Sequence, residues 1–183
     1  MKTRSQKQTI QDLIDRLSRL NAADEWNGPL NPSQFAALSY LGRANQMSRA
    51  PSHVADYLAT TRGTASQTLK ALARKDLIEE TRSETDKRSI RYDVTAAGLD
   101  ILEHPSALNG AIGALESETS EALATGLETL VNTALKRQGG RSFGICITCR
   151  HHEEQRDGGY CRLLKITLSP KQTTQICNEH SPS

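Results

Sequence analysis

The stretch from residue 61 to residue 95 limits the fold of this chain more than any other, because it joins two different periodicities. Its first part carries apolar residues at spacings of four and three, at Ala65, Leu69 and Leu72. This spacing is typical of an amphipathic helix with one buried face. Thr61 precedes the helix at the N-cap position, where its hydroxyl can accept a hydrogen bond from the first turn. The residues that should point away from the core are small or polar, namely Arg62, Thr64, Ser66, Gln67 and Lys70.

The second part of this stretch alternates with a period of two. Ile90, Tyr92 and Val94 should share one side of an extended chain, which is the pattern of a half-buried strand. Residues 77–83 can supply the partner strand. The tip at 84–88 has no Gly or Pro for a tight turn, so we expect a longer, protruding loop. A helix followed by a hairpin with a basic tip is the plan of a winged helix.

The charge distribution favours a role for this stretch in binding nucleic acid. The whole chain has a net charge of only +2, which by itself indicates no such partner. From 61 to 91, however, eight residues are basic and five acidic, whereas 107–135 holds four acids and no base. Small side chains at the start of the helix would let its backbone approach base edges in a major groove. One end of the molecule should therefore face phosphates while the other repels them.

The run from Asp86 to Gly98 resembles the signature of the MarR family of bacterial winged-helix regulators. That family carries Asp-x-Arg at the wing tip and then a strand that ends in Thr-x-x-Gly, here Asp86-Lys87-Arg88 and Thr95-Ala96-Ala97-Gly98. The resemblance covers about residues 5 to 138. It implies that Arg88 enters the minor groove while Asp86 holds its guanidinium. The alternative is an ordinary exposed ion pair, which would contribute little.

The remaining segments up to residue 140 should be helical. A stripe of Ile and Leu residues predicts a helix over 6–23, which the resemblance places in a dimer interface. Asn31-Pro32 should start a second helix and Pro51 a third, with His53 on its solvated side. We expect 46–49 to be extended.

After residue 98 we expect helices again, with a kink at Pro105. Ser117 should cap a final helix that ends at Gly139-Gly140. The apolar stripes of these helices are wide for a monomer, so we expect them to bury a homodimer core with the first helix of a second copy.

All four cysteines lie in the last 38 residues. Cys146-x-x-Cys149 is followed after eleven residues by Cys161 and after fifteen more by Cys177. Cys161-Arg162-Leu163-Leu164 and Cys177-Asn178-Glu179-His180 resemble a tail found in a subset of the family. Ser169-Pro170 predicts a short helix with Cys177 at its end, which would bring Cys177 back to the first pair. We expect His151 and His152 to be solvated.

Four interpretations of these cysteines compete. Unrelated thiols would not gather in one segment, and a thioredoxin-type dithiol needs a βαβ unit that is missing here. A structural zinc site could use four thiolates, or Cys146, Cys149, Cys177 and His180. An iron–sulfur cluster, 2Fe-2S or 4Fe-4S, would use all four cysteines. The long loops around Cys161 favour the cluster, with zinc as the alternative.

The sequence therefore predicts a mainly α fold with a small β-hairpin wing: a winged helix-turn-helix with a helical dimerisation region and a cysteine-rich metal-binding tail. The expected parts are 1–30 and 99–140 for dimerisation, 31–98 for DNA binding and 141–183 for the tail. We expect a cytoplasmic homodimer, without a signal peptide or membrane span, that binds a palindromic operator in double-stranded DNA.

The expected function is transcriptional regulation, as a repressor, with the tail sensing redox state, iron or oxygen. No nucleophile context for an enzyme is present. The main alternative is a repressor that responds to a small phenolic or aromatic compound and uses zinc as a structural staple. A third is an interaction module whose tail docks a protein. Deleting 141–183 should remove regulation in the first case and spare it in the second.

Overall fold

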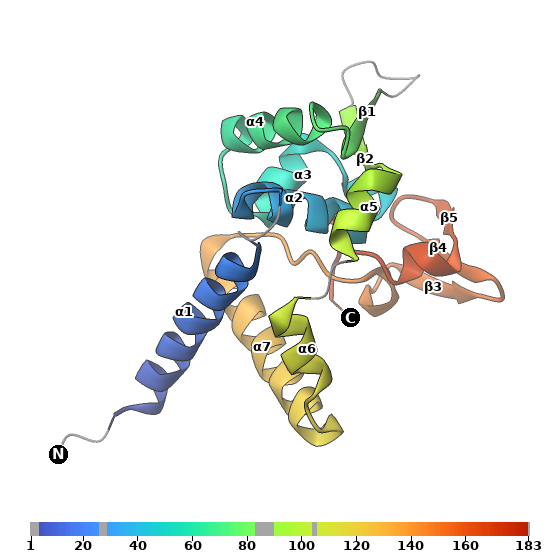
Figure 1. The fold of residues 1–183 in the computed structure, drawn as a ribbon. Coiled ribbons are helices and arrows are strands. Elements are labelled where there is room, and N and C mark those ends of the chain that lie inside the picture. The colour runs from blue at the N-terminus through green and yellow to red at the C-terminus, as the bar shows by residue number, and fades with distance from the viewer. Residues whose placement is uncertain (1–3, 26–28, 83–89, 104–105, 183) are drawn as a thin grey trace.

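The computed structural model describes residues 4–25, 29–82, 90–103 and 106–182 (Figure 1). It has three parts, which are a winged helix, a helical stalk and a cysteine-bearing tail. The winged helix comprises α2 (Pro32–Arg43), the 3-10 helix η1 (Gln46–Ser48), α3 (Pro51–Tyr57), α4 (Arg62–Ala73), β1 (Ile78–Arg82), β2 (Ile90–Val94) and α5 (Ala96–Leu102). The stalk comprises α1 (Gln6–Glu25), α6 (Ala107–Gly113) and α7 (Ser117–Gln138). The tail comprises η2 (Cys146–Thr148), β3 (His152–Gln155), β4 (Gly158–Cys161), β5 (Ile166–Leu168) and α8 (Pro170–Thr173).

The winged helix has its core between α2, α3, α4 and the hairpin. Ala65, Leu69 and Leu72 of α4 are buried there, as their spacing predicts. The hairpin is antiparallel, with Ile78 paired to Val94 and Arg82 paired to Ile90. The mainly helical fold with a small β wing is therefore confirmed, while the wing tip at 83–89 lies outside the described residues.

Local capping explains where the helices of this part begin. The Asn31 side chain accepts a hydrogen bond from the Gln34 N–H, and the Gln34 side chain accepts one in return from the Asn31 N–H. The Thr61 hydroxyl accepts from the Thr64 N–H at 3.1 Å. Both starts are predicted by the sequence, because a cap needs only neighbouring residues.

The Thr-x-x-Gly run after β2 has a structural explanation. The Thr95 hydroxyl donates to the Asp76 carbonyl at 2.7 Å and accepts from the Gly98 N–H, which fixes the start of α5 against the end of α4. A Cβ on Gly98 would collide with the carbonyl oxygen of Leu77. This position therefore requires glycine for close packing.

The segment after α2 corrects one prediction. Residues 46–49 are not extended, because 46–48 form η1. The cause is tertiary. Asn45 and Ser48 are fully buried, and the Ser48 N–H donates to the Asn45 carbonyl at 2.9 Å, which closes the turn.

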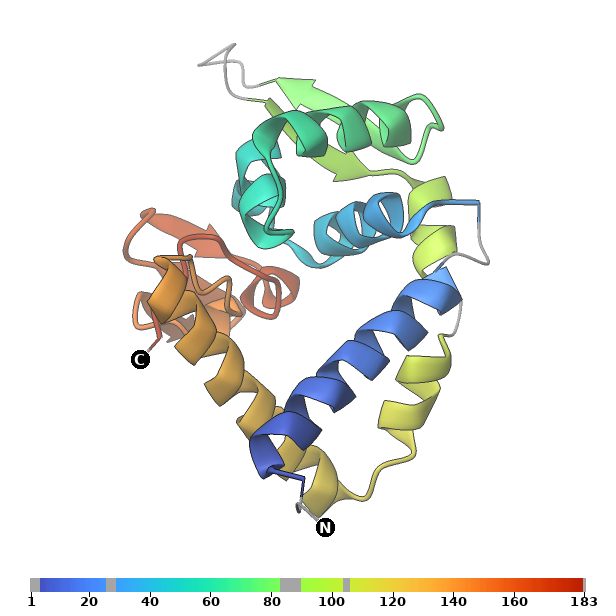
Figure 2. The ribbon, with the colours of Figure 1, turned by 90° about the vertical axis from the view of Figure 1, so that its left-hand side faces the viewer.

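The stalk extends away from the winged helix, with α1 beside α6 (Figure 2). The chain folds back between α6 and α7, and α7 ends at Gly139, whose φ of 67° is the left-handed cap expected there. Ser117 does not cap α7. Glu116 occupies the N-cap without a side-chain hydrogen bond, so the helix begins one residue earlier than the sequence suggests.

The tail folds back against the winged helix. Its strands form an antiparallel sheet in the order β3-β4-β5, and Ser169 caps α8 with a capping box. Ile176 forms bridges with both Ala44 and Ile145, so it joins the tail to the end of α2. Cys177 lies four residues beyond the end of α8. The tail is thus part of the same packed body as α2 and η1.

Candidate nucleic-acid interface and cysteine pocket

The outer face of α4 is the first candidate site. Arg62, Thr64, Gln67 and Lys70 are exposed and Ser66 is half-buried, on the side opposite the buried leucines. In Figure 1 this helix forms one edge of the molecule, with the hairpin beside it and the stalk at the opposite end. The helix therefore presents a polar, convex surface with its small residues at the N-terminal end.

The hairpin places further basic residues next to this face. Arg82 on β1 is exposed and forms an ion pair with Glu80 at 2.9 Å. Arg91 on β2 pairs with Asp93 at 3.2 Å. Asp86 and Arg88, the wing residues singled out in the sequence, lie outside the described residues. Their contact with DNA stays a prediction.

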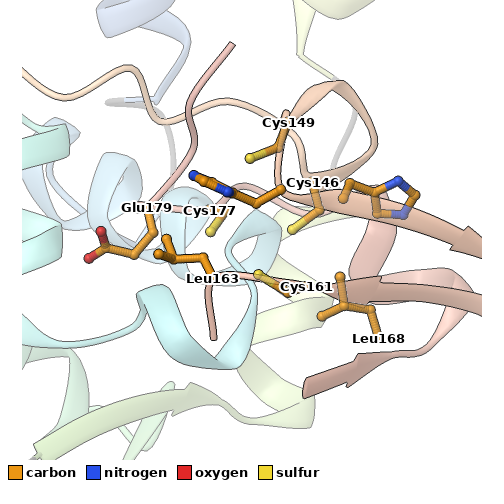
Figure 3. A pocket seen from close by; sticks show the side chains of 9 residues that line it. Cys146, Cys149, Cys161, Leu163, Leu168, Cys177 and Glu179 are labelled. Carbon is orange, nitrogen blue, oxygen red and sulfur yellow. The ribbon is translucent and has the colours of Figure 1, made fainter. Parts of the chain in front are cut away.

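The second candidate site is a pocket lined by all four cysteines (Figure 3). Cys146 starts η2, Cys161 ends β4 and Cys177 follows α8. Cysteines up to 31 positions apart in the chain therefore line one pocket, and Cys177 approaches it by a loop and not at the end of a helix. The other lining residues are His151, His152, Leu163, Leu168 and Glu179.

The two buried thiols of this pocket share a hydrogen bond and are surrounded by donors. The hydrogen bond between them raises the pKa of Cys146, with burial adding to the effect, and the same bond lowers the pKa of Cys177. Asn45 donates its amide N–H to the Cys146 sulfur at 3.5 Å. Asn45, the Glu179 N–H and Ser48 also stabilise the Cys177 thiolate. Such donors are typical of sulfurs that carry negative charge.

The remaining thiols are less enclosed. Cys149 and Cys161 are half-buried, and the Ser181 N–H donates to the Cys149 sulfur at 3.4 Å. Among the described residues, no three Cys, His, Asp or Glu side chains form a ready-made metal site. The four sulfurs face a common pocket in Figure 3 but would have to draw closer around a bound ion or cluster. Four thiolate donors with N–H groups around them fit a soft metal ion or an iron–sulfur cluster.

The histidines differ from what the sequence suggests. The ring of His180 lies between two hydroxyl groups, with Nδ1 2.9 Å from Ser142 Oγ and Nε2 3.0 Å from Thr148 Oγ1. His180 does not line the pocket. His151 and His152 are half-buried pocket residues rather than solvated ones, and the ring of His152 lies against Gly159 of β4. The buried Nε2 of His152 has no hydrogen-bond partner within the described part of the chain.

His53 also corrects an expectation. We expected it to be solvated, but it is half-buried and its Nε2 accepts from Asn178 Nδ2 at 3.1 Å. Burial lowers the pKa of His53, and the nearby Arg141 lowers it further. The tail covers this face of α3, which periodicity within α3 could not indicate.

Sequence reasoning missed the polar residues that hold the pocket to the winged helix. Asn45, Ser48 and Asn178 are buried and hydrogen-bonded to one another through the Ser48 hydroxyl. Asn178 lies inside the Cys-x-Glu-His run, and this position could have identified it as a residue of the site. Asn45 and Ser48 lie about a hundred residues before the first cysteine, and nothing in their neighbourhood marks them.

Comparison with known proteins finds a family match in the winged-helix part of the chain. Residues 29–89 match the model of the MarR family. The comparison with curated proteins found no match. No helix in the described ranges is long and apolar enough to cross a membrane.

Solved structures share the fold. FabT of Streptococcus pneumoniae in complex with DNA has a TM-score of 0.57 at 22% identity. MepR of S. aureus has a TM-score of 0.54 as a DNA complex and 0.57 in a DNA-binding conformation, each at 19% identity. Each comparison covers 72% of this chain and 99% of the other, so over a quarter of this chain has no counterpart there. Residues 29–89 are thus similar to the MarR family, and the solved structures share the winged-helix fold of this chain.

Proposed function

We propose that the protein is a dimeric transcriptional regulator, acting as a repressor, that binds a palindromic operator in double-stranded DNA. The observation that carries this proposal is the exposed polar face of α4 beside the hairpin, on a fold shared with MepR and FabT in their DNA complexes. Arg62, Thr64, Ser66, Gln67 and Lys70 would contact the major groove. Asp86 and Arg88 would act at the minor groove.

The exposed apolar stripes of the stalk support the proposed dimer. The apolar side chains of α1 and α7 that form one stripe each remain between 39% and 56% exposed in the single chain. A monomer would leave this surface in water, which is unfavourable by about 25 cal/mol for each Å². A second copy that covers the stalk would also set the distance between two recognition helices. The residues concerned are Ile10, Leu13, Ile14, Leu17, Leu20, Leu123, Leu127, Leu130 and Val131.

The cysteine pocket would hold a metal through Cys146, Cys149, Cys161 and Cys177 and make DNA binding responsive to redox state, iron or oxygen. We favour an iron–sulfur cluster over zinc because of the long loops around Cys161. Cys161 lies in the pocket, whereas His180 faces away and is hydrogen-bonded to two hydroxyls. This supports the set of four cysteines over the set that includes His180. When bound, such a cluster would supply a reversible one-electron change close to η1.

The alternative is a repressor that responds to a small molecule and uses zinc as a structural staple. One observation favours it. The tail packs Phe143 and Ile176 against the core of the winged helix, which is what a staple would do. The two functions differ in whether the metal site changes DNA affinity.

The test begins with protein purified without oxygen. Its metal content and visible spectrum are recorded, and DNA fragments are selected from a random double-stranded pool. We expect coloured protein, an inverted-repeat consensus and protection of two half-sites about one helical turn apart. Exposure to air or a chelator should then change the affinity for the selected fragment at fixed salt. Colourless protein with one zinc per chain and unchanged affinity would favour the staple, and failure to enrich any fragment would contradict DNA binding itself.

A further inference from the structure

The turn between α2 and α3 touches both candidate sites. We call residues 45–49 the Asn45–Arg49 turn. Its first residue contacts the cysteine pocket and its last residue contacts the wing, and the single 3-10 turn η1 lies between them. The tail and the wing therefore share one short, buried element.

On the pocket side, the turn is held by hydrogen bonds at fully buried atoms. Asn45 Nδ2 donates to the Cys146 sulfur at 3.5 Å, and Asn45 Oδ1 accepts from the Ser48 hydroxyl at 2.7 Å. The Ser48 hydroxyl in turn accepts from the Asn178 N–H at 2.9 Å. Met47 packs against the cluster formed by Cys146, Leu168 and Cys177. Three of the five residues in the turn are thus in contact with the surroundings of the sulfurs.

On the wing side, the turn is joined to β2 by side chain and backbone. Arg49 Nη1 lies 2.7 Å from Asp93 Oδ1, with both side chains about one fifth exposed. The Arg49 carbonyl accepts from the Tyr92 N–H at 3.1 Å. The second oxygen of Asp93 accepts from the Thr81 hydroxyl on β1 at 3.1 Å, so the contact reaches both strands of the hairpin.

We propose that the Asn45–Arg49 turn transmits the state of the cysteine pocket to the wing. This inference rests on the proposed function, because it takes metal binding or oxidation at the cysteines as its input. A sulfur that carries charge accepts a stronger hydrogen bond than a neutral or oxidised one. The hydrogen bond from the Asn45 amide to Cys146 therefore changes in strength when the cysteines bind metal or are oxidised. Close packing around Asn45 and Ser48 prevents the turn from absorbing the movement locally. The displacement then reaches Arg49 and, through Asp93 and Tyr92, the hairpin.

This route does not pass through the stalk, although the tail follows α7 directly in the chain. It also requires no change in the dimer. Coupling between two sites is reciprocal, so DNA held by the wing should change metal affinity by the same factor as metal changes DNA affinity, typically about 5- to 150-fold.

The experiment measures amide hydrogen exchange of the full-length protein, treated with chelator and then with or without Zn²⁺ alone as the probe metal. Zinc affinity is measured separately by competition with a chromophoric chelator. We expect zinc to change exchange of the β2 amides, including Tyr92, by at least about fivefold. Amides of α1 (6–25) serve as the internal reference and should not change.

Three variants test the route. D93N removes the charge from the wing contact and so weakens it with an isosteric side chain, and N45A removes the pocket contact without removing a cysteine. E80Q is the matched control, because Glu80 lies on the same hairpin and accepts from Tyr92 Oη but does not contact the turn. D93N and N45A should bind zinc with a much smaller response in β2, whereas E80Q should respond like the wild type. Unfolding curves establish that each variant is folded before exchange is measured.

The outcomes separate the two proposals. Transmission through the turn would be overturned by any of three results: zinc binds to the wild type without changing hydrogen exchange in β2, it changes exchange equally in α1, or D93N and N45A show the full change in β2. Each of these results would leave the metal site intact. Absence of zinc binding to the wild type would overturn the cysteine site and remove the input on which the turn depends.

Discussion

Phe143 packs edge-on against Tyr57, with ring centroids 5.3 Å apart and planes at 79°. Its ring also approaches Tyr40, which is fully buried, at 6.1 Å. Phe143 precedes the cysteines, so this contact pins the start of the tail to α2 and α3. Deleting 141–183 would uncover these tyrosines, and that deletion therefore does not separate regulation from stability.

Replacing this aromatic contact should destabilise the whole winged helix. We expect Phe143→Ala to lower the free energy of unfolding by about 1–3 kcal/mol, less than for a fully buried Phe, because the ring is only half-buried. Urea unfolding followed by circular dichroism measures the effect. Ile147→Ala is the control, since Ile147 is 59% exposed and should change the midpoint little. Equal effects of the two variants would contradict the role of Phe143.

The outer face of α4 should contribute charge to DNA binding. If Lys70 touches only phosphate, Lys70→Ala should weaken binding of every sequence and reduce the slope of log affinity against log salt by about one unit. Fluorescence anisotropy at several salt concentrations gives the slope. Lys7→Ala removes the same charge from the first turn of α1, whose N-terminal end lies away from α4 (Figure 1), and should leave the slope unchanged. A slope that is identical for all three proteins would exclude Lys70 from the interface.

The stalk should be the dimer interface. A charge placed in the apolar stripe by Leu127→Glu should produce monomers at micromolar concentration and lose DNA affinity together with dimerisation, because each half-site is bound weakly alone. Sedimentation velocity measures the oligomeric state. Asn132→Glu places the same charge on the opposite side of α7 and should remain dimeric. A wild-type protein that sediments as a monomer would contradict the assignment.

Metal binding should depend on Cys161. Cys161→Ser should lower metal affinity by more than about tenfold, because it removes one of four thiolates. His180→Gln should retain the metal, since His180 is directed at Ser142 and Thr148. Elemental analysis and the visible spectrum of anaerobic protein provide the readout. The opposite ranking, with metal lost in His180→Gln and kept in Cys161→Ser, would favour a zinc site made by Cys146, Cys149, Cys177 and His180.

Mildly acidic pH should destabilise the packing of the tail against α3. The pKa of His53 is lowered by burial and then by Arg141, with Glu179 and Asp56 opposing, so the folded state favours the neutral ring. Its contribution to stability is present above the unfolded pKa of about 6.5 and is lost as the pH falls below that value through the lowered folded pKa. Protonation of Nε2 would also remove the bond from Asn178.

The measurement is the urea midpoint at neutral and mildly acidic pH. His53→Gln should reduce the fall in stability on acidification but not abolish it, because burial lowers the pKa of His180 as well. His151→Gln serves as a control that keeps both of these groups. A fall that is as steep in His53→Gln as in the wild type would show that His53 does not contribute.

Much of the winged helix could be predicted from the sequence because its information is local. The spacing of Ala65, Leu69 and Leu72 determines which face of α4 is buried, and the caps at Asn31 and Thr61 depend on residues three positions away. The alternation through Tyr92 likewise places β2. The gathering of all four cysteines in one segment also indicates, by itself, that they share a pocket.

The contacts that join the tail to the winged helix were decided only by the tertiary structure. Asn45 and Cys146 are 101 residues apart, and Ser48 and Asn178 are 130 apart, so no periodicity links them. The same packing buries His53 and bends residues 46–48 into η1, where local preference indicates an extended chain. Buried polar groups must find partners wherever the fold supplies them, and such partners become known only when the distant segments have come together.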